Sequence, residues 1–462
     1  MIDVAQMRVA QRAWAARSVR ERLRVVRAAR ELIAEDARLF AGEVGGRGVA
    51  DTLAAEVLPL LEACRYLERE SVGILRVRKL RGRRALWLRG VSGEVRREAH
   101  GVVLVIGPGN YPLFLPGVQA LQGLVAGNAV IWKPGLGGEK VAQRFDVMMR
   151  RAGLPDGLLV VTDESRAAAE RAIDVGVDKV FLTGSAATGR VVMRKLAETL
   201  TPSVMELSGC DAVFVLESAD VERVVDALLF GLRLNGSATC MAPRRVFGGA
   251  AVMEALTQRL LVRAKELPAV ALSAETGALV EEIVADAHKH EGVFVREAGA
   301  TVILRGRTEM RAMSADVFAP LVTLCEVEGE AAALEAYAKC KYALTAAVFG
   351  EERAALAMAA KIEAGTVLVN DVIVPTADAR APFGGRGKSG FGVTRGREGL
   401  LEMTAVKTVL IRRGKDARHY APTAAEHAAM FGGYAIAAHG RGPGVRLRGM
   451  WHTIKVAMKI GK

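Results

Sequence analysis

Hydrophobic positions along this chain alternate between short continuous runs and amphipathic stretches. The continuous apolar runs predict strands at 101–106, 129–132, 158–161 and 179–183. Segments between them have helical periodicity, which predicts helices at about 114–127 and 138–152. Parallel strands covered on both faces have such unbroken apolar runs. Strands that alternate with helices predict a doubly wound α/β domain.

A second α/β pattern runs from about residue 211 to 380. It comprises expected strands at 212–215, 244–247 and 346–349 and a helix at 220–234. Before the first domain, residues 3–45 predict helix, because apolar residues recur at helical spacing between arginines. Residues 84–98 alternate like strands and are broken by glycines, which indicates a hairpin. The Gly- and Ala-rich segment after about residue 413 departs from these patterns and is predicted to be an appendage.

Composition narrows the class of protein. The chain has 462 residues, and no apolar run approaches the roughly 20 residues that span a bilayer. Its five cysteines are scattered without a CxxC pair, which predicts a reducing, cytoplasmic location. We expect neither a disulfide framework nor a metal site, since no His and Cys residues have zinc-site spacing.

The net charge of +13 resides in two local segments. Residues 76–89 and 441–462 hold seven and six basic residues and no acid, so the rest of the chain is balanced. With only 5% aromatic residues, this pattern argues against nucleic-acid binding. Within 445–462, four apolar residues follow helical spacing with lysines on another face (Leu447, Trp451, Ile454, Met458). Such a helix either lies on an anionic membrane surface or packs on the protein body.

Two turns between a strand and a helix are candidate phosphate sites. They are Gly107-Pro-Gly-Asn110 and Thr183-Gly184-Ser185-Ala-Ala-Thr-Gly189. Lys133, at the end of a neighbouring strand, is a further candidate. Free backbone N–H groups and the helix dipole favour anions at such turns. Glycines there can also serve packing alone, and Lys133 can be a solvated charge. No GxGxxG fingerprint is present.

Cys240 and Glu206 are the candidate reactive residues. A thiolate is a strong nucleophile toward an electrophilic carbon, and a carboxylate can activate the water that releases the captured group. Taken singly, a cysteine in an Ala- and Thr-rich context is more often a core residue. The flanking segments decide between these interpretations.

Seven segments together resemble the successive signatures of the NAD(P)-dependent aldehyde dehydrogenase family over about residues 6–410. They are Gly101-Val-Val-Leu-Val-Ile-Gly-Pro-Gly-Asn110-Tyr-Pro, Ile131-Trp-Lys133-Pro134, Phe181-Leu-Thr-Gly-Ser185, Glu206-Leu-Ser-Gly209, Cys240-Met-Ala-Pro-Arg, Asp316-Val-Phe-Ala-Pro320 and Ala381-Pro-Phe-Gly-Gly-Arg-Gly-Lys-Ser-Gly390. The short N-terminus and the Asn110-Tyr-Pro context resemble the compact class that includes fatty-aldehyde enzymes.

The resemblance implies oxidation of an aldehyde to a carboxylic acid with NAD or NADP. Cys240 would be the nucleophile, Glu206 the base for thioester hydrolysis and Asn110 a donor to the oxyanion. Cofactor contacts would come from the strand ends and turns: Gly107, Lys133, Gly184, Ser185, Gly189 and Asp316. Two other functions stay open, namely an acylating or reductive CoA-dependent enzyme and a catalytically inactive structural relative.

The resemblance also implies the domain organisation. We expect a Rossmann-type cofactor domain (1–77 and 101–207), an α/β catalytic domain (208–400), a β oligomerisation arm (78–100 and 401–412) and a basic C-terminal extension (413–462). The arm would pair edge strands between subunits of a homodimer or homotetramer.

Five departures from the family pattern bear on the site. Gly109 stands where an aromatic residue is usual, which we expect to widen the substrate tunnel. Ser208 and Cys210 replace a glycine and a lysine, and Asp316 replaces a longer glutamate against the nicotinamide ribose. Leu136 replaces a glutamate that disfavours a 2′-phosphate, so NADP is admissible.

Overall fold

The structure is a computed structural model that describes residues 2–82, 85, 88, 90–297, 299–414, 418–420 and 422–460. The chain divides into two compact units, Met1–Arg78 with Val95–Thr408 and Lys79–Glu94 with Val409–Lys462. The mixed α/β class predicted from the sequence is confirmed. The larger unit is built on two sheets.

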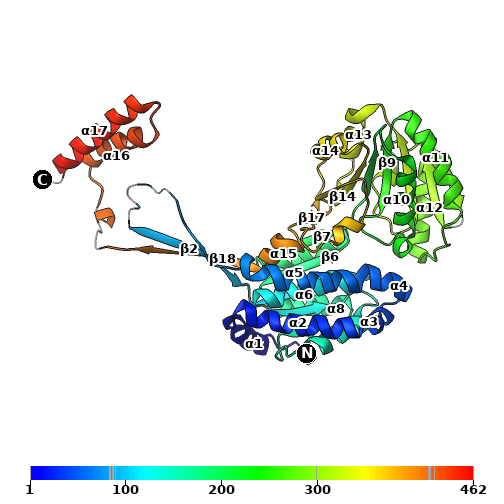
Figure 1. The fold of residues 1–462 in the computed structure, drawn as a ribbon, viewed down its shortest axis with the longest axis horizontal. Helices are drawn as coiled ribbons and strands as arrows, with labels where there is room; N and C mark the ends of the chain where they lie inside the picture. The colour runs from blue at the N-terminus through cyan, green and yellow to red at the C-terminus, as the bar shows by residue number, and fades with distance from the viewer. Residues whose placement is uncertain are drawn as a thin grey trace. The chain divides into compact units, whose positions relative to one another are not determined.

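The first sheet has six strands in the order β17-β7-β6-β3-β4-β5 (Figure 1). Its members are β3 (Val102–Ile106), β4 (Ala129–Lys133), β5 (Leu159–Val161), β6 (Lys179–Gly184), β7 (Ser203–Leu207) and β17 (Gly390–Phe391). All pairs are parallel except β17 with β7. The strand order reverses between β3 and β6, and ligands of open α/β sheets bind at such a reversal. Both predicted phosphate turns follow these two strands.

Helices cover this sheet and largely match the expected segments. Helix α6 (Phe114–Ala126) is buried along its whole length, and α7 (Glu139–Arg151) and α8 (Arg166–Asp174) separate the following strands. Helix α9 (Ala186–Ala197) begins directly after Ser185, which caps it by accepting a hydrogen bond from Thr188 N. Gly189 therefore lies inside the helix and not in the turn before it.

The helical structure expected over 3–45 is confirmed, but it is divided among several helices. Three helices occupy the region, α1 (Val4–Ala16), α2 (Val19–Glu35) and α3 (Ala37–Glu43). Ser18 and Glu21 form a capping box, which ends one helical pattern and starts the next. Helix α4 (Val49–Thr52), a π-helical turn (Leu53–Val57) and helix α5 (Leu58–Ile74) follow.

The second sheet has seven strands in the order β10-β11-β12-β9-β8-β14-β15. Its bounds are β8 (Asp211–Val215), β9 (Pro243–Gly248), β10 (Val293–Glu297), β11 (Ala300–Leu304), β12 (Leu321–Glu326), β14 (Thr345–Phe349) and β15 (Thr366–Val369). One apolar cluster packs α10 (Val221–Arg233) and α11 (Ala250–Ala264) against the sheet. Another packs α12 (Ala274–Lys289), α13 (Gly329–Ala338) and α14 (Glu352–Ala359). The strands and the helix predicted here are confirmed.

A three-stranded sheet joins β1 (Arg78–Lys79), β2 (Val91–Ala99) and β18 (Thr404–Arg412) in the order β1-β2-β18. Strand β2 covers the second half of the hairpin expected over 84–98. Positions 83, 84, 86, 87 and 89, which belong to the expected arm, lie outside the described residues. Strand β18 covers the segment 404–411 that was assigned to the same arm.

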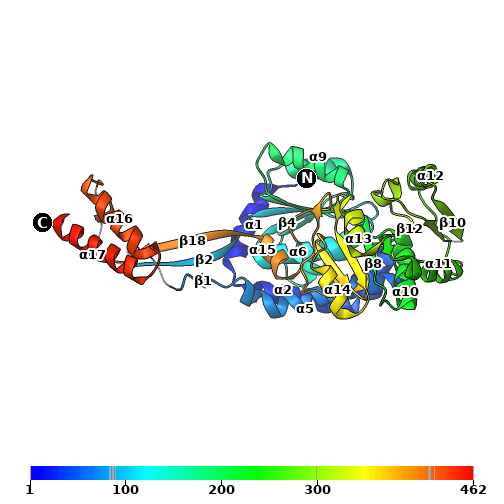
Figure 2. The ribbon, with the colours of Figure 1, turned by 90° about the horizontal axis from the view of Figure 1, so that it is seen from above.

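Helices α16 (Glu426–His439) and α17 (Pro443–Ile460) lie side by side in the smaller unit (Figures 1 and 2). Gly449 sits at their contact, where a Cβ would lie 2.6 Å from Ala437 N. The apolar positions predicted for this segment are exposed within the unit, with Trp451 at 72%. Across the described residues, no helix combines the length and the apolarity that a membrane span requires.

Candidate active site

Two cavities of the larger unit meet at Cys240 and Glu206. The first, of about 330 Å³, has mostly apolar walls that include Phe114, Phe230 and Phe383. The second, of about 470 Å³, is lined by the turns after β3 and β6 together with Asp316. Cys240 and Glu206 line both cavities. The structure therefore brings the two candidate reactive residues to the same space.

Strand β7 carries Glu206 into the site, where its side chain is buried at 2% exposure. Thr394 Oγ1 donates a 2.8 Å hydrogen bond to Glu206 Oε2, whereas Oε1 has no partner among the described residues. Burial raises the pKa of the Glu206 carboxyl, and the charge of Arg395 and the Thr394 hydrogen bond partly offset this. A carboxyl with a raised pKa and a free oxygen is suited to accept a proton near neutral pH.

Cys240 follows a strained segment of chain. Asn235 and Ser237 adopt positive φ angles of 52° and 61°, and Gly236 has a φ of 58°. Gly209 approaches the Cys240 backbone so closely that a Cβ would lie 2.6 Å from Cys240 O. Burial raises the pKa of the Cys240 thiol, and the charges of Glu206 and Asp211 add to the effect.

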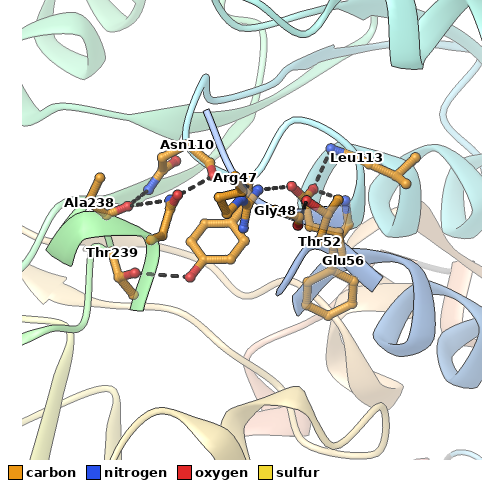
Figure 3. Close-up of polar contacts among 11 residues, drawn as sticks. Arg47, Gly48, Thr52, Glu56, Asn110, Leu113, Ala238 and Thr239 are labelled. Carbon is orange, nitrogen blue, oxygen red and sulfur yellow. Dashed lines mark hydrogen bonds and ion pairs between the residues drawn. The ribbon is translucent and has the colours of Figure 1, made fainter. Parts of the chain in front are cut away.

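Asn110 reaches the Cys240 loop across the second cavity. Its side-chain Nδ2 donates a 2.9 Å hydrogen bond to Ala238 O (Figure 3). Its backbone carbonyl accepts hydrogen bonds from Arg47 Nη2 and Asn235 Nδ2, each 3.1 Å long. The amide nitrogen carries two hydrogens, and this bond uses one of them.

An ion pair that the sequence analysis did not predict contacts the backbone of Asn110. Arg47 pairs with Glu56, whose side chain is fully buried in the π-helical turn (Figure 3). Glu56 Oε2 also accepts hydrogen bonds from Leu113 N at 2.7 Å and Phe114 N at 2.9 Å. One carboxylate thus holds both Arg47 and the start of α6, which fixes the turn that carries Asn110. Burial raises the pKa of Glu56, and the Arg47 charge partly offsets this.

The second cavity gathers three of the residues assigned to the cofactor. Gly184, Ser185 and Asp316 line it. Burial raises the pKa of the Asp316 carboxyl, and the nearby Ser208 hydroxyl and the charge of Arg244 partly offset this. Ser208 and Asp316, which both depart from the family pattern, are therefore neighbours. The turns, the carboxylate and the strand reversal together fit a dinucleotide.

The other three residues assigned to the cofactor lie apart from the cavity walls. Gly107 N donates to Lys133 O, so these two residues face each other at the ends of β3 and β4. Lys133 is buried at 8% exposure, and burial lowers the pKa of its ammonium group. Gly189 packs on Leu207, where a Cβ would lie 3.0 Å from Cδ2. This contact supports close packing as one reason why position 189 is a glycine.

The expectation that Gly109 widens the substrate tunnel is wrong. Gly109 lines the second cavity and not the apolar one. A Cβ at this position would lie 2.9 Å from Leu136 O, because the chain after Lys133 folds back against the turn. The glycine therefore allows two backbone segments to approach. Leu136 itself is 80% exposed.

The described residues contain no group of three or more His, Cys, Asp or Glu side chains that could hold a metal ion.

The model of the aldehyde dehydrogenase family matches residues 2–409. The 4,4'-diapolycopene aldehyde oxidase of a Methylomonas species is 30% identical over 401 residues, which cover 83% of this chain and 74% of that protein. A candidate NADP(+)-dependent succinate-semialdehyde dehydrogenase of Mycolicibacterium smegmatis is 30% identical over 439 residues, with coverages of 88% and 84%.

Solved structures show the same fold. The betaine aldehyde dehydrogenase of Staphylococcus aureus in complex with NAD+ superposes with a TM-score of 0.82 at 23% identity, covering 91% of this chain and 88% of that one. An aldehyde dehydrogenase of Mycobacterium tuberculosis complexed with NAD+ gives the same TM-score and identity, with 90% of each chain covered. The chain therefore belongs to the aldehyde dehydrogenase family and is an NAD(P)-dependent oxidoreductase.

Proposed function

We propose that this enzyme oxidises an aldehyde to the carboxylic acid with Cys240 as nucleophile, Glu206 as base and Asn110 as oxyanion donor. The observation that carries the proposal is that Cys240 and Glu206 lie where the apolar cavity meets the cavity of the nucleotide turns. An aldehyde in the first cavity and a nicotinamide in the second would both reach the sulfur. A purely structural relative would not require this junction.

The first step is addition of the Cys240 thiolate to the aldehyde carbon, which creates a tetrahedral alkoxide. Asn110 Nδ2 would stabilise that charge with the hydrogen that does not bond Ala238 O. Donors of this kind are worth about 3 kcal/mol in the transition state. The Arg47–Glu56 pair holds the Asn110 backbone, so the amide is positioned before the charge develops.

The second step is hydrolysis of the thioester on Cys240. Glu206 Oε1 would accept a proton from water, while Thr394 holds Oε2 in place. NAD(P)+, when bound, supplies the hydride acceptor that turns the adduct into that thioester. We propose that Gly107, Lys133, Gly184, Ser185, Gly189 and Asp316 hold this cofactor, with NADP as admissible as NAD.

A CoA-dependent acylating or reductive reaction is the alternative enzyme function. Glu206 disfavours it, because a buried base beside the thioester serves water. The test is NAD(P)H absorbance on addition of medium-chain aldehydes, with and without CoA. We expect turnover without CoA. A strict CoA requirement would replace hydrolysis by acyl transfer, and no absorbance change with any aldehyde would favour an inactive relative.

Glu206→Gln should separate the two steps. Glutamine keeps the side-chain shape but cannot accept the water proton, so we expect steady-state turnover to fall by about 10²- to 10⁴-fold. The first turnover should persist as a burst of NAD(P)H, and intact-mass spectrometry should detect the acyl group on Cys240. Rapid steady-state turnover without that adduct would contradict the role of Glu206.

For the domain organisation, we propose that 1–77 with 101–207 bind the cofactor and that 208–400 supply the catalytic thiol. The β strands within 78–100 and 401–412 are proposed to pair with those of a second subunit in a homodimer or homotetramer. Strand β18 supports this assignment, because it exposes Val406, Leu410 and Ile411.

We further propose that the enzyme is cytoplasmic and that its helix α17 contacts an anionic membrane surface. Leu447, Trp451 and Met458 are each more than 60% exposed within their unit, and the segment carries no acid. We expect the full-length protein to sediment with anionic liposomes and a variant ending at residue 440 to stay in solution. Equal, negligible sedimentation of both would show that the exposed apolar residues of α17 serve another purpose.

A further inference from the structure

Arg395 is a buried cation in the wall of the apolar cavity, which Cys240 and Glu206 also line. Its residue exposure is 3%. The guanidinium lies over the Phe383 ring at 4.4 Å and over the Phe114 ring at 5.5 Å from the centroids. These rings fix the guanidinium within the cavity wall, so Arg395 is not a surface residue with a mobile side chain.

The charge of Arg395 is only partly compensated. Nη1 donates a 2.5 Å hydrogen bond to Thr376 O, but Nε and Nη2 have no partner among the described residues. No described carboxylate lies within ion-pair distance, and Glu206 is instead hydrogen-bonded to Thr394. Burial lowers the pKa of Arg395, and the charges of Glu206 and Cys240 partly offset this. Buried charges are normally paired, so the two guanidinium nitrogens without a partner favour an anionic ligand.

The two unpartnered nitrogens define the shape of that anion. The Nε–H and one Nη2–H of a guanidinium point in the same direction and form a two-donor fork. A carboxylate accepts both bonds in parallel, which is the most specific pairing that arginine makes. The other walls are largely hydrocarbon, with Leu115, Phe230 and Ile373 among them. The cavity therefore suits a ligand with an apolar chain and one anionic group.

The backbone of Arg395 is also strained. Its φ and ψ are 60° and 176°, a region that favours glycine. Strain of this kind persists where the surrounding structure imposes it, and it concentrates at ligand sites. An arginine in place of a glycine here costs stability, which is consistent with a function for its side chain.

We propose that Arg395 binds the carboxylate of the substrate, and that the preferred substrates are aldehydes with a carboxylate at the far end of an apolar chain. This inference rests on the proposed function, because the aldehyde carbon must reach Cys240 while the carboxylate reaches Arg395. Arg395 would be a specificity-determining residue in addition to Cys240, Glu206 and Asn110. The candidate succinate-semialdehyde dehydrogenase among the relatives is named for a substrate of this class.

The test compares ω-oxo acids with n-alkanals of the same carbon count over a series of chain lengths. We expect the wild-type enzyme to favour the oxo acid in kcat/KM by about 10- to 100-fold at its best length, as for a hydrogen-bonded charged group. Arg395→Met should abolish that ratio, and Arg395→Lys should retain part of it. Arg397→Met, which removes an exposed arginine two residues away, should leave the ratio unchanged.

Two results would overturn the proposal. One is a wild-type preference for n-alkanals at every length. The other is an equal fall for both substrate types in Arg395→Met, which would mean that the guanidinium acts on Cys240 or Glu206 and not on the substrate tail.

Binding of hexanoate, followed by calorimetry, gives a readout that needs neither turnover nor cofactor. Wild-type protein should bind hexanoate at least about 10-fold more tightly than it binds hexanol. It should also bind hexanoate at least about 10-fold more tightly than the Arg395→Met variant does. Equal affinities would contradict the carboxylate site. Failure of every aldehyde to react, with hexanoate binding intact, would instead count against the proposed oxidation alone.

Discussion

Replacing Cys240 with alanine should abolish aldehyde oxidation, with kcat lowered by about 10⁵-fold or more. Without the sulfur no covalent adduct forms, and neither Glu206 nor Asn110 can substitute as a nucleophile. The measurement is NAD(P)H formation at saturating aldehyde, with intact-mass spectrometry to show that no acyl group is attached. Because Cys240 is only partly buried and lies in a turn, we expect the variant to fold normally.

Cys325→Ala is the matched control for this experiment. Cys325 lies in β12, is 4% exposed and lines neither of the two cavities. Its loss should leave kcat and KM close to the wild-type values, with a modest loss of stability from the small cavity that it leaves. If Cys240→Ala retained turnover while Cys325→Ala lost it, the assignment of the nucleophile would be wrong.

Local sequence patterns predicted the central strands and helices well. Each apolar run from 101 to 183 became a strand of the first sheet, because burial on both faces leaves few places for polar residues. At the N-terminus the helical structure was predicted but its division was not, because helical periodicity continues across Ser18, where a capping box starts α2. A helix boundary inside an unbroken periodic pattern is visible only through its cap residues.

Motifs singled out Cys240 and Glu206 but not the buried charged residues of the same region. Cys240 and Glu206 stand out because their neighbours resemble known signatures. Arg47, Glu56 and Arg395 carry no local signal, since charged residues are common on helices and loops. Their importance follows from burial and from contacts across more than fifty residues of sequence, such as Glu56 with Leu113. The S/T-x-x-E pattern reveals caps, but no comparable pattern reveals a buried ion pair.

The second large effect is expected from Glu56→Ala, which should lower the free energy of unfolding by about 3–5 kcal/mol. The substitution leaves Arg47 buried without its counter-charge and removes the acceptor for Leu113 N and Phe114 N. Thermal or urea unfolding measures the loss. Activity should fall as well, because the Asn110 turn loses the contacts that position it.

The double variant Arg47→Met with Glu56→Leu separates stability from positioning. Apolar replacements remove both buried charges, and such exchanges are often neutral or stabilising. We therefore expect the double variant to be more stable than Glu56→Ala. Its kcat should nevertheless stay below that of the wild-type enzyme, because Asn110 O loses the hydrogen bond from Arg47 and the oxyanion donor is less well positioned. Wild-type kcat in a stably folded double variant would show that the ion pair serves the fold alone.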